Sequence, residues 1–285
     1  MSDLRTQDAA AWMGTIVEGF DPSMFDDEAV CTELQELFDS RGFLVFRGGE
    51  LTYADQARMC EMLIRKPAST PSDVPADDTY YISNARPNSA APHGRLQFHM
   101  DTAWSDRPNQ IVSLYATELE QPATPTLFAS MVHGYATMPA ELRTRIEGLE
   151  AIDSADQNRR RGNVDDVLLS PIERPPWTRK PVVLAHPRTG DLLIYVGEQN
   201  TKEIVGMGRS DGEALLDEIF DHVYEPAMVW NHQWQLHDLV CWDNIAVQHA
   251  RPNVALNGPA RTLRKIATPM PALASDELPV YVDIS

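Results

Sequence analysis

The sequence predicts a mostly β fold with flanking helices, arranged as a sandwich or a jelly roll. Two observations favour it. Many short segments carry β-branched and aromatic residues, whereas only three segments have helical periodicity. Turn-forming clusters such as Arg188-Thr189-Gly190-Asp191 separate several of the short segments. The 285 residues contain no internal repeat and no low-complexity linker, so we expect one domain over residues 1–285.

The three helices are predicted from apolar residues that recur on one face. The first follows a capping Asp26 or Asp27, and its apolar face comprises Val30, Leu34, Leu37 and Phe38. The second begins where Thr52 and Asp55 have the spacing of a capping box. The third runs from about residue 210 and ends before Pro226. We expect the first two to pack outside the sheets.

Strands are predicted at Phe43–Arg47, Tyr80–Ser83, Arg95–Asp101, Ile111–Thr117, Thr126–Met131, Val182–His186, Leu192–Val196, Leu239–Trp242, Ile245–His249 and Arg261–Thr268. Residues Gln157–Pro181 carry four prolines and no clear period, which predicts a long loop. Loops of this length are usually functional or disordered, so we expect a lid over the active site, in which Arg159, Arg160 and Arg161 are mainly solvated.

Charge and composition exclude several classes of partner. With 42 acidic and 24 basic residues the formal charge is −18, which repels phosphate backbones and predicts no nucleic-acid partner. The sequence has no apolar run near the ~20 residues that a membrane helix needs, and no secretory signal is visible. The three cysteines, Cys31, Cys60 and Cys241, are scattered, so a reducing cytoplasm is expected. A homo-oligomer stays possible.

The candidate metal ligands are His99, Asp101 and His249. In the segment Phe98-His99-Met100-Asp101, side chains alternate on a strand, so His99 and Asp101 face the same way. His249 ends an apolar strand and is the best third ligand. Two histidines and one carboxylate on one face of Fe(II) leave positions open for a chelating 2-oxo acid and O2. Each motif alone also occurs by chance, and then the residues are structural.

A strand after His249 carries a candidate anion partner. Arg261, Leu263 and Lys265 share one face of this strand. A cation on the inward face of a β-rich core is costly unless an anion neutralises it. The planar fork of Arg261 suits the distal carboxylate of 2-oxoglutarate. A surface salt bridge is the alternative for Arg261.

Together these residues resemble the taurine dioxygenase family, which includes the phenoxyacetate-herbicide dioxygenases. The resemblance spans roughly Phe43 to Thr268 and is carried by Phe98-His99-Met100-Asp101-Thr102-Ala103-Trp104, Thr126-Leu127-Phe128-Ala129-Ser130-Met131, His186-Pro187-Arg188-Thr189-Gly190, Trp242-Asp243-Asn244, His249 and Arg261. It implies a double-stranded β-helix, or jelly roll, and an Fe(II)- and 2-oxoglutarate-dependent dioxygenase that consumes O2 and releases succinate and CO2. By this resemblance Thr126 and Arg261 hold 2-oxoglutarate.

Departures from the family pattern bear on this assignment. Ala123-Thr124-Pro125 stands where relatives often have Gly-Gly-Asp, which weakens the case for Thr126 relative to Arg261. His237-Asp238 replaces the family's Gly-Asp in a loop. Asp101 is present, whereas related halogenases carry a small residue there, so halogenation is disfavoured.

The substrate is expected to be a small, anionic molecule. Arg95 lies on the predicted face of His99, and Lys265 lies on that of Arg261, so both are candidate substrate-binding residues. Each is about as readily explained by pairing with an Asp or Glu. The sequence does not distinguish hydroxylation, desaturation and oxidative cleavage. The alternatives to an oxygenase are a jelly-roll metal-dependent isomerase or lyase and a non-catalytic small-molecule-binding protein.

Overall fold

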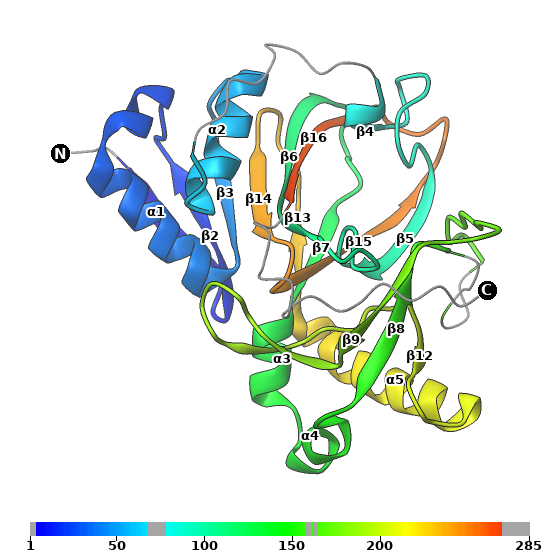
Figure 1. Ribbon diagram of the computed structural model, residues 1–285. Coiled ribbons are helices and arrows are strands. Elements are labelled where there is room, and N and C mark those ends of the chain that lie inside the picture. Colours follow the sequence, from blue (N-terminus) through cyan, green and yellow to red (C-terminus); the bar gives the residue numbers. More distant parts are fainter. Residues whose placement is uncertain (1–3, 68–77, 158–160, 162–164, 270–285) are drawn as a thin grey trace.

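The computed structural model describes residues 4–67, 78–157, 161 and 165–269. Two facing antiparallel-rich sheets form the predicted double-stranded β-helix (Figure 1). The larger sheet comprises, in spatial order, β1 (Arg5–Ala10), β2 (Met13–Glu18), β3 (Phe43–Arg47), β14 (Leu239–Asp243), β6 (Asn109–Leu119), β16 (Arg261–Pro269) and β4 (Tyr81–Ser83). The smaller comprises β13 (Val229–His232), β7 (Thr126–Ser130), β15 (Val247–Val254) and β5 (Gly94–His99).

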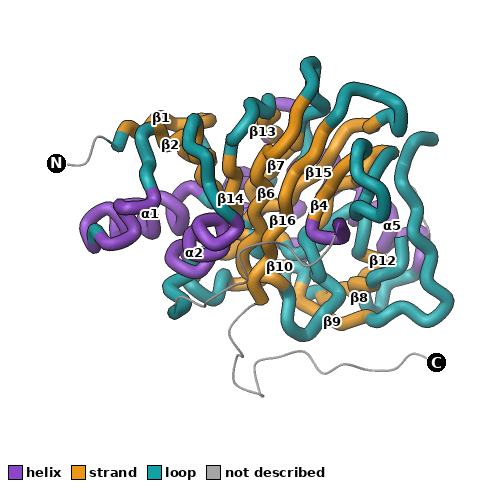
Figure 2. The backbone as a smooth tube through the Cα atoms, turned by 90° about the horizontal axis from the view of Figure 1, so that it is seen from above, coloured by secondary structure: helices purple, strands orange, loops and turns teal. Residues whose placement is uncertain are grey.

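Two helices cover the outer face of the larger sheet, as expected (Figure 2). Helix α1 (Glu28–Arg41) is capped by Asp27, whose side chain accepts hydrogen bonds from two backbone N–H groups of the first turn. Helix α2 (Tyr53–Leu63) begins with the predicted capping box between Thr52 and Asp55. Their apolar faces pack against Leu44, Tyr115 and Leu239 of the sheet. The N-terminal caps and the buried apolar faces therefore explain where these two helices begin and how they pack on the sheet.

The outer face of the smaller sheet is covered by a second group of elements. These are α3 (Met131–Thr137), α4 (Ala140–Ile146), α5 (Arg209–Val223), a hairpin of β10 (Val183–Ala185) and β11 (Leu192–Ile194), and a three-stranded sheet of β8 (Glu150–Ser154), β9 (Trp177–Pro181) and β12 (Thr201–Ile204). Short 3-10 helices lie at Pro22–Asp26, Asp78–Tyr80 and Pro226–Met228. No helix in the part of the chain that the structure describes is long and apolar enough to cross a bilayer.

Large side chains fill the space between the two sheets. Phe43 and Trp242 project from the larger sheet and meet Phe128 of the smaller, with ring centroids 5.3 and 5.4 Å apart. Leu263 and Val247 belong to the same core, and both are fully buried. This core holds the two sheets face to face and forms one wall of the cavity described below.

Several predicted elements differ from the structure. The strand predicted over Arg95–Asp101 ends at His99, so Asp101 follows it in a turn. The strand predicted to end at His249 continues as β15 to Val254, since its later residues still pair with β5. Part of the predicted 157–181 loop is strand β9, because residues 177–181 pair with β8. Its middle runs beside β5 through hydrogen bonds that join Arg95 to Asp166 and Leu168. Arg159 and Arg160 lie outside the described residues.

Candidate active site

The three predicted metal ligands lie together at one end of the smaller sheet. His99, the last residue of β5, is the antiparallel partner of His249 in β15, and their ring centroids are 4.1 Å apart. Asp101 follows just beyond β5, with its Oδ1 3.6 Å from His99 Nε2. One donor atom from each of the three residues lies within 4.8 Å of the others. This separation is compatible with a single ion between them.

The surroundings of these side chains suit a divalent metal. His99 Nδ1 lies 2.8 Å from the Gln97 carbonyl oxygen, which leaves Nε2 free to face Asp101 if Nδ1 donates. Burial and the neighbouring His99 hold the pKa of His249 well below its ordinary value. Burial alone would raise the pKa of Asp101, but Lys265 and the two histidines outweigh it and hold that pKa well below 3.8. Neutral imidazoles and an ionised carboxylate are the forms that bind Fe(II).

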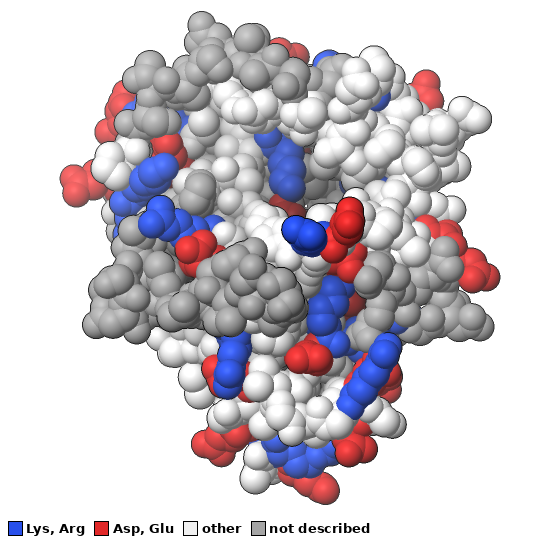
Figure 3. Space-filling model, turned by 45° about the vertical axis from the view of Figure 1, so that its right-hand side comes forward, with Lys and Arg blue, Asp and Glu red and all other residues white. Residues whose placement is uncertain are grey.

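These residues line a cavity of about 290 Å³ between the two sheets. The predicted cosubstrate residues Thr126 and Arg261 line it, as does Lys265. Its other lining residues include Ile82, Ala90, Ala91, Leu96, Leu114, Gln157, Leu168, Ser170, Gln199, Trp242, Ala250 and Arg251. The described part of the predicted lid therefore contributes to the cavity wall. Figure 3 shows Lys and Arg side chains in a hollow of the molecular surface, with acidic and basic side chains interspersed around it.

Arg261 is a buried cation, with 3% of its surface exposed. Its Nε donates to the Thr124 carbonyl at 2.9 Å and its Nη2 to Thr126 Oγ1 at 3.1 Å. Burial, with the nearby Arg251, lowers its pKa to about 9. Within the described ranges no carboxylate lies at ion-pair distance from Arg261. The alternative of a surface salt bridge is therefore wrong for Arg261.

Sequence reasoning missed a second buried cation in the same cavity. Arg251 is 4% exposed and donates to the carbonyl oxygens of Ala91, His93 and Gly94 at 2.7–2.8 Å. Burial lowers its pKa to about 10. The sequence does contain a signal for Arg251. It lies two residues after His249, so the two side chains would share a face if the strand continued. Because the predicted strand ends at His249, Arg251 falls outside it and is not a candidate.

The two predicted substrate-binding residues lie in different places. Lys265 Nζ is 2.5 Å from Asp101 Oδ2 and lines the cavity. Arg95 instead pairs with Asp166, at 2.8 Å from Nε to Oδ1, and is not among the residues that line the cavity. The physical reason is a register shift in β5, where Leu96 pairs with Arg251 but His99 with His249. The shift breaks the strict alternation on which the placement of Arg95 depended.

The family model described as "Taurine catabolism dioxygenase TauD, TfdA family" matches residues 5–266. Curated relatives include pentalenolactone F synthase of Streptomyces avermitilis, 26% identical over 90% of each chain. The 2,4-dichlorophenoxyacetate dioxygenase of Cupriavidus pinatubonensis, named as α-ketoglutarate-dependent, is 25% identical over 83% of this chain and 87% of its own. The alkylsulfatase of Acinetobacter baylyi is 27% identical over 85% and 77%.

Solved structures share the fold. A taurine dioxygenase from Burkholderia xenovorans superposes with a TM-score of 0.75 at 20% identity, covering 98% of this chain and 97% of its own. AAD-2, crystallised with Mn(II) and N-oxalylglycine, superposes with a TM-score of 0.73 at 20% identity over 94% and 98%. With a family match along nearly the whole chain, this protein belongs to the TauD/TfdA family of Fe(II)- and 2-oxoglutarate-dependent dioxygenases.

Proposed function

We propose that His99, Asp101 and His249 hold Fe(II), and that Arg261 with Thr126 holds the distal carboxylate of 2-oxoglutarate. The reaction oxidises a small molecule with O2 and releases succinate and CO2. One observation carries this proposal: Arg261, a buried guanidinium with no described carboxylate partner, lines the same cavity as the His-Asp-His group. Such a cation is costly to bury unless a ligand anion completes the pair.

The chain's own residues prepare this site. Fe(II) held by His99, Asp101 and His249 would supply the redox chemistry between 2-oxoglutarate and O2. Arg261 presents its fork to a carboxylate, and Thr126 Oγ1 accepts hydrogen bonds from both Arg261 Nη2 and Trp234 Nε1, each at 3.1 Å. Trp234 is 2% exposed, so it shields this contact from water. The low local dielectric strengthens the attraction between the guanidinium and the cosubstrate.

For the substrate we propose a small anionic molecule that Lys265 attracts. Lys265 lies at ion-pair distance from the ligand group, since its ammonium is 2.5 Å from Asp101 Oδ2. Apolar side chains, including Ile82 and Leu114, line the same cavity and would contact the rest of the molecule. One relative is named for a phenoxyacetate and another for alkyl sulfates, which supports the proposal that the substrate carries an anionic group. Arg95 has no part in this proposal.

The test is a screen of small carboxylates, sulfonates and sulfates for succinate formation and O2 uptake that depend on 2-oxoglutarate. A hit should disappear in His249→Ala and weaken in Lys265→Met. A conversion that proceeds without O2 or 2-oxoglutarate would instead assign an isomerase or lyase. Normal turnover by His249→Ala would contradict the ligand assignment.

The remaining parts of the proposal concern the whole chain. The family match over residues 5–266 supports a single oxygenase domain. The described part of the 157–181 segment borders the cavity, which supports its role as a lid. Cys31, Cys60 and Cys241 are free thiols, which supports a reducing compartment such as the cytoplasm.

A further inference from the structure

The side chain of Asn244 forms hydrogen bonds with both the N–H and the carbonyl oxygen of Asp101. Asn244 Oδ1 accepts the Asp101 N–H at 2.9 Å, and Nδ2 donates to the carbonyl oxygens of Asp101 at 2.9 Å and Asn109 at 2.8 Å. Asn244 is 1% exposed. Both N–H donors and the amide oxygen are used, so only one orientation of the amide satisfies its neighbours.

Asp101 needs such support because it lies outside the sheet. Strand β5 ends at His99, and Thr102 has a φ of 58°, a conformation that is strained for a β-branched residue. The next part of this turn is held by Lys180, a buried ammonium that donates to the carbonyl oxygens of Ala103 and Ser105. Side chains, rather than strand pairing, therefore determine where the Asp101 carboxylate points.

The neighbouring Asp243 holds the turn that leads to the other ligand. Its Oδ1 accepts the backbone N–H groups of Ile245 at 3.0 Å and Ala246 at 3.2 Å, directly before β15, which carries His249. Asp243 is 2% exposed. Burial alone would raise its pKa, but His186 and Arg188 outweigh burial and lower the pKa to about 2. The acceptor is thus ionised at neutral pH.

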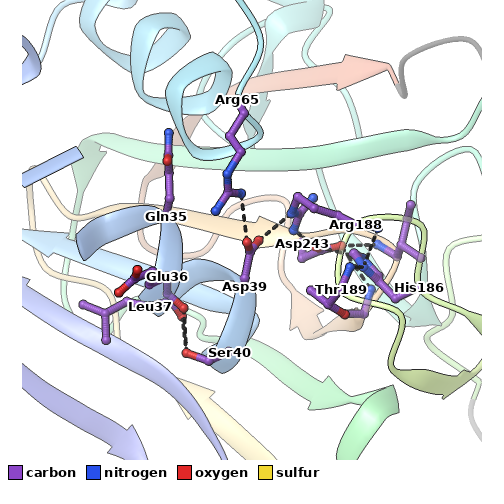
Figure 4. Close-up of polar contacts among 12 residues, drawn as sticks. Gln35, Glu36, Leu37, Asp39, Ser40, Arg65, His186, Arg188, Thr189 and Asp243 are labelled. Carbon is purple, nitrogen blue, oxygen red and sulfur yellow. Dashed lines mark hydrogen bonds and ion pairs between the residues drawn. The ribbon is translucent and has the colours of Figure 1, made fainter. Parts of the chain in front are cut away.

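A network of ion pairs anchors Asp243 to helix α1 (Figure 4). Its Oδ2 pairs with Arg188 and lies 3.1 Å from His186 Nε2. Arg188 also pairs with Asp39 of α1, and Asp39 pairs with Arg65 at 2.8 Å. The chain of contacts runs from helix α1 through the β10–β11 hairpin to the turn between β14 and β15.

We propose that Asp243 and Asn244 are positioning residues that set Asp101 and His249 in one geometry before metal binds. The inference rests on the proposed metal site and goes beyond it, because neither residue is among those that line the cavity. Asn244 acts on the Asp101 backbone, and Asp243 on the start of the strand of His249. Loss of such outer contacts typically weakens metal binding by about 10–100-fold.

Titration of the full chain with Mn(II), followed by the electron paramagnetic resonance signal of free Mn(II), tests the proposal. Asn244→Ala should bind Mn(II) about 10–100-fold more weakly than wild type. Asn244→Asp keeps the shape and the acceptor but sets a carboxylate against two carbonyl oxygens, so it should also bind weakly. Asn200→Ala is the matched control, since Asn200 is 4% exposed, its amide donates to the Ser154 carbonyl, and neither residue is among those that line the cavity. It should lose stability yet keep wild-type Mn(II) affinity.

Wild-type Mn(II) affinity in Asn244→Asp would overturn the proposal, and this holds even if the alanine variant does not fold. Equal weakening in Asn200→Ala would also overturn it, because the effect would then follow stability alone. His249→Ala tests the ligand set separately: if wild type binds no Mn(II), or His249→Ala binds it normally, the proposed metal site fails and the inference fails with it.

Discussion

Replacing Arg261 with Met should abolish tight 2-oxoglutarate binding without destabilising the ligand-free protein. The contact it removes is a charge-assisted pair worth about 1.5–3 kcal/mol, which corresponds to a 10- to 150-fold rise in Kd. Isothermal titration of the Mn(II)-loaded protein with 2-oxoglutarate measures this directly.

The stability half of this prediction follows from the burial of Arg261. Lowering its pKa from 12.5 to about 9 corresponds to roughly 5 kcal/mol of penalty on the charged form. The two hydrogen bonds that Arg261 donates offset this by about 1 kcal/mol each. The melting temperature of ligand-free Arg261→Met should therefore equal or exceed that of wild type, while its rise on adding 2-oxoglutarate should shrink.

Arg264→Met is the control on the same strand. Arg264 is 8% exposed and faces α2, where it donates to Gln56 Oε1 at 2.7 Å and to the Leu51 carbonyl at 2.9 Å. Its loss should lower the melting temperature and leave the 2-oxoglutarate affinity unchanged. The reasoning is refuted if Arg261→Met binds 2-oxoglutarate normally, or if the two variants behave alike. Either result would place the anchor elsewhere.

Three further predictions concern the cavity and the core. Thr126→Val should weaken 2-oxoglutarate binding less than Arg261→Met and cost about 1–3 kcal/mol of stability, since two buried donors lose their acceptor; wild-type stability by denaturant titration would contradict this. Burial raises the pKa of Asp153 from 3.8 to about 6, so its stabilising effect is present below pH 3.8 and is lost as pH rises through 6. Asp153→Asn should therefore raise the free energy of unfolding at pH 8, by up to roughly 3 kcal/mol, and give no gain at pH 3.5; an equal gain at both would argue against titration of Asp153. Amides in residues 165–170 should exchange hydrogen more slowly once 2-oxoglutarate and substrate bind, and equal exchange in both states would argue against a lid.

Local rules were sufficient for much of the fold. The Thr52–Asp55 capping box and the apolar stripes predicted α1, α2 and α5 within a few residues. They were insufficient for β1, whose Arg5–Ala10 residues are mostly exposed and lack an apolar alternation. They also failed for β9, where Trp177–Pro181 contains two cations and a proline and is held by pairing with β8. Both strands depend on tertiary partners that no short window contains.

The same division holds at the candidate site. The alternation His99-x-Asp101 and the spacing of Arg261 to Lys265 indicated residues that do meet in one cavity. Arg95 was misplaced because a register shift in β5 is invisible without the partner strand. Asn244 belongs to the motif Trp242-Asp243-Asn244, but its hydrogen bond with the Asp101 backbone joins residues far apart in the chain, which the motif alone does not predict. Patterns within a strand were readable, whereas contacts between strands were not.

The candidate site is built from two sheets, so the distance between the metal ligands and Arg261 depends on how the core between the sheets is packed. His99 and His249 belong to the smaller sheet, whereas Arg261 and Lys265 belong to β16 of the larger. The spacer between them includes Trp242, whose ring centroid is 4.7 Å from that of His249. A volume change at this spacer would alter the span between the ligand group and the cation that faces it. Because 2-oxoglutarate has a fixed length, a change in this distance would weaken its binding. Variants with a repacked core would then favour 2-oxo acids of another chain length.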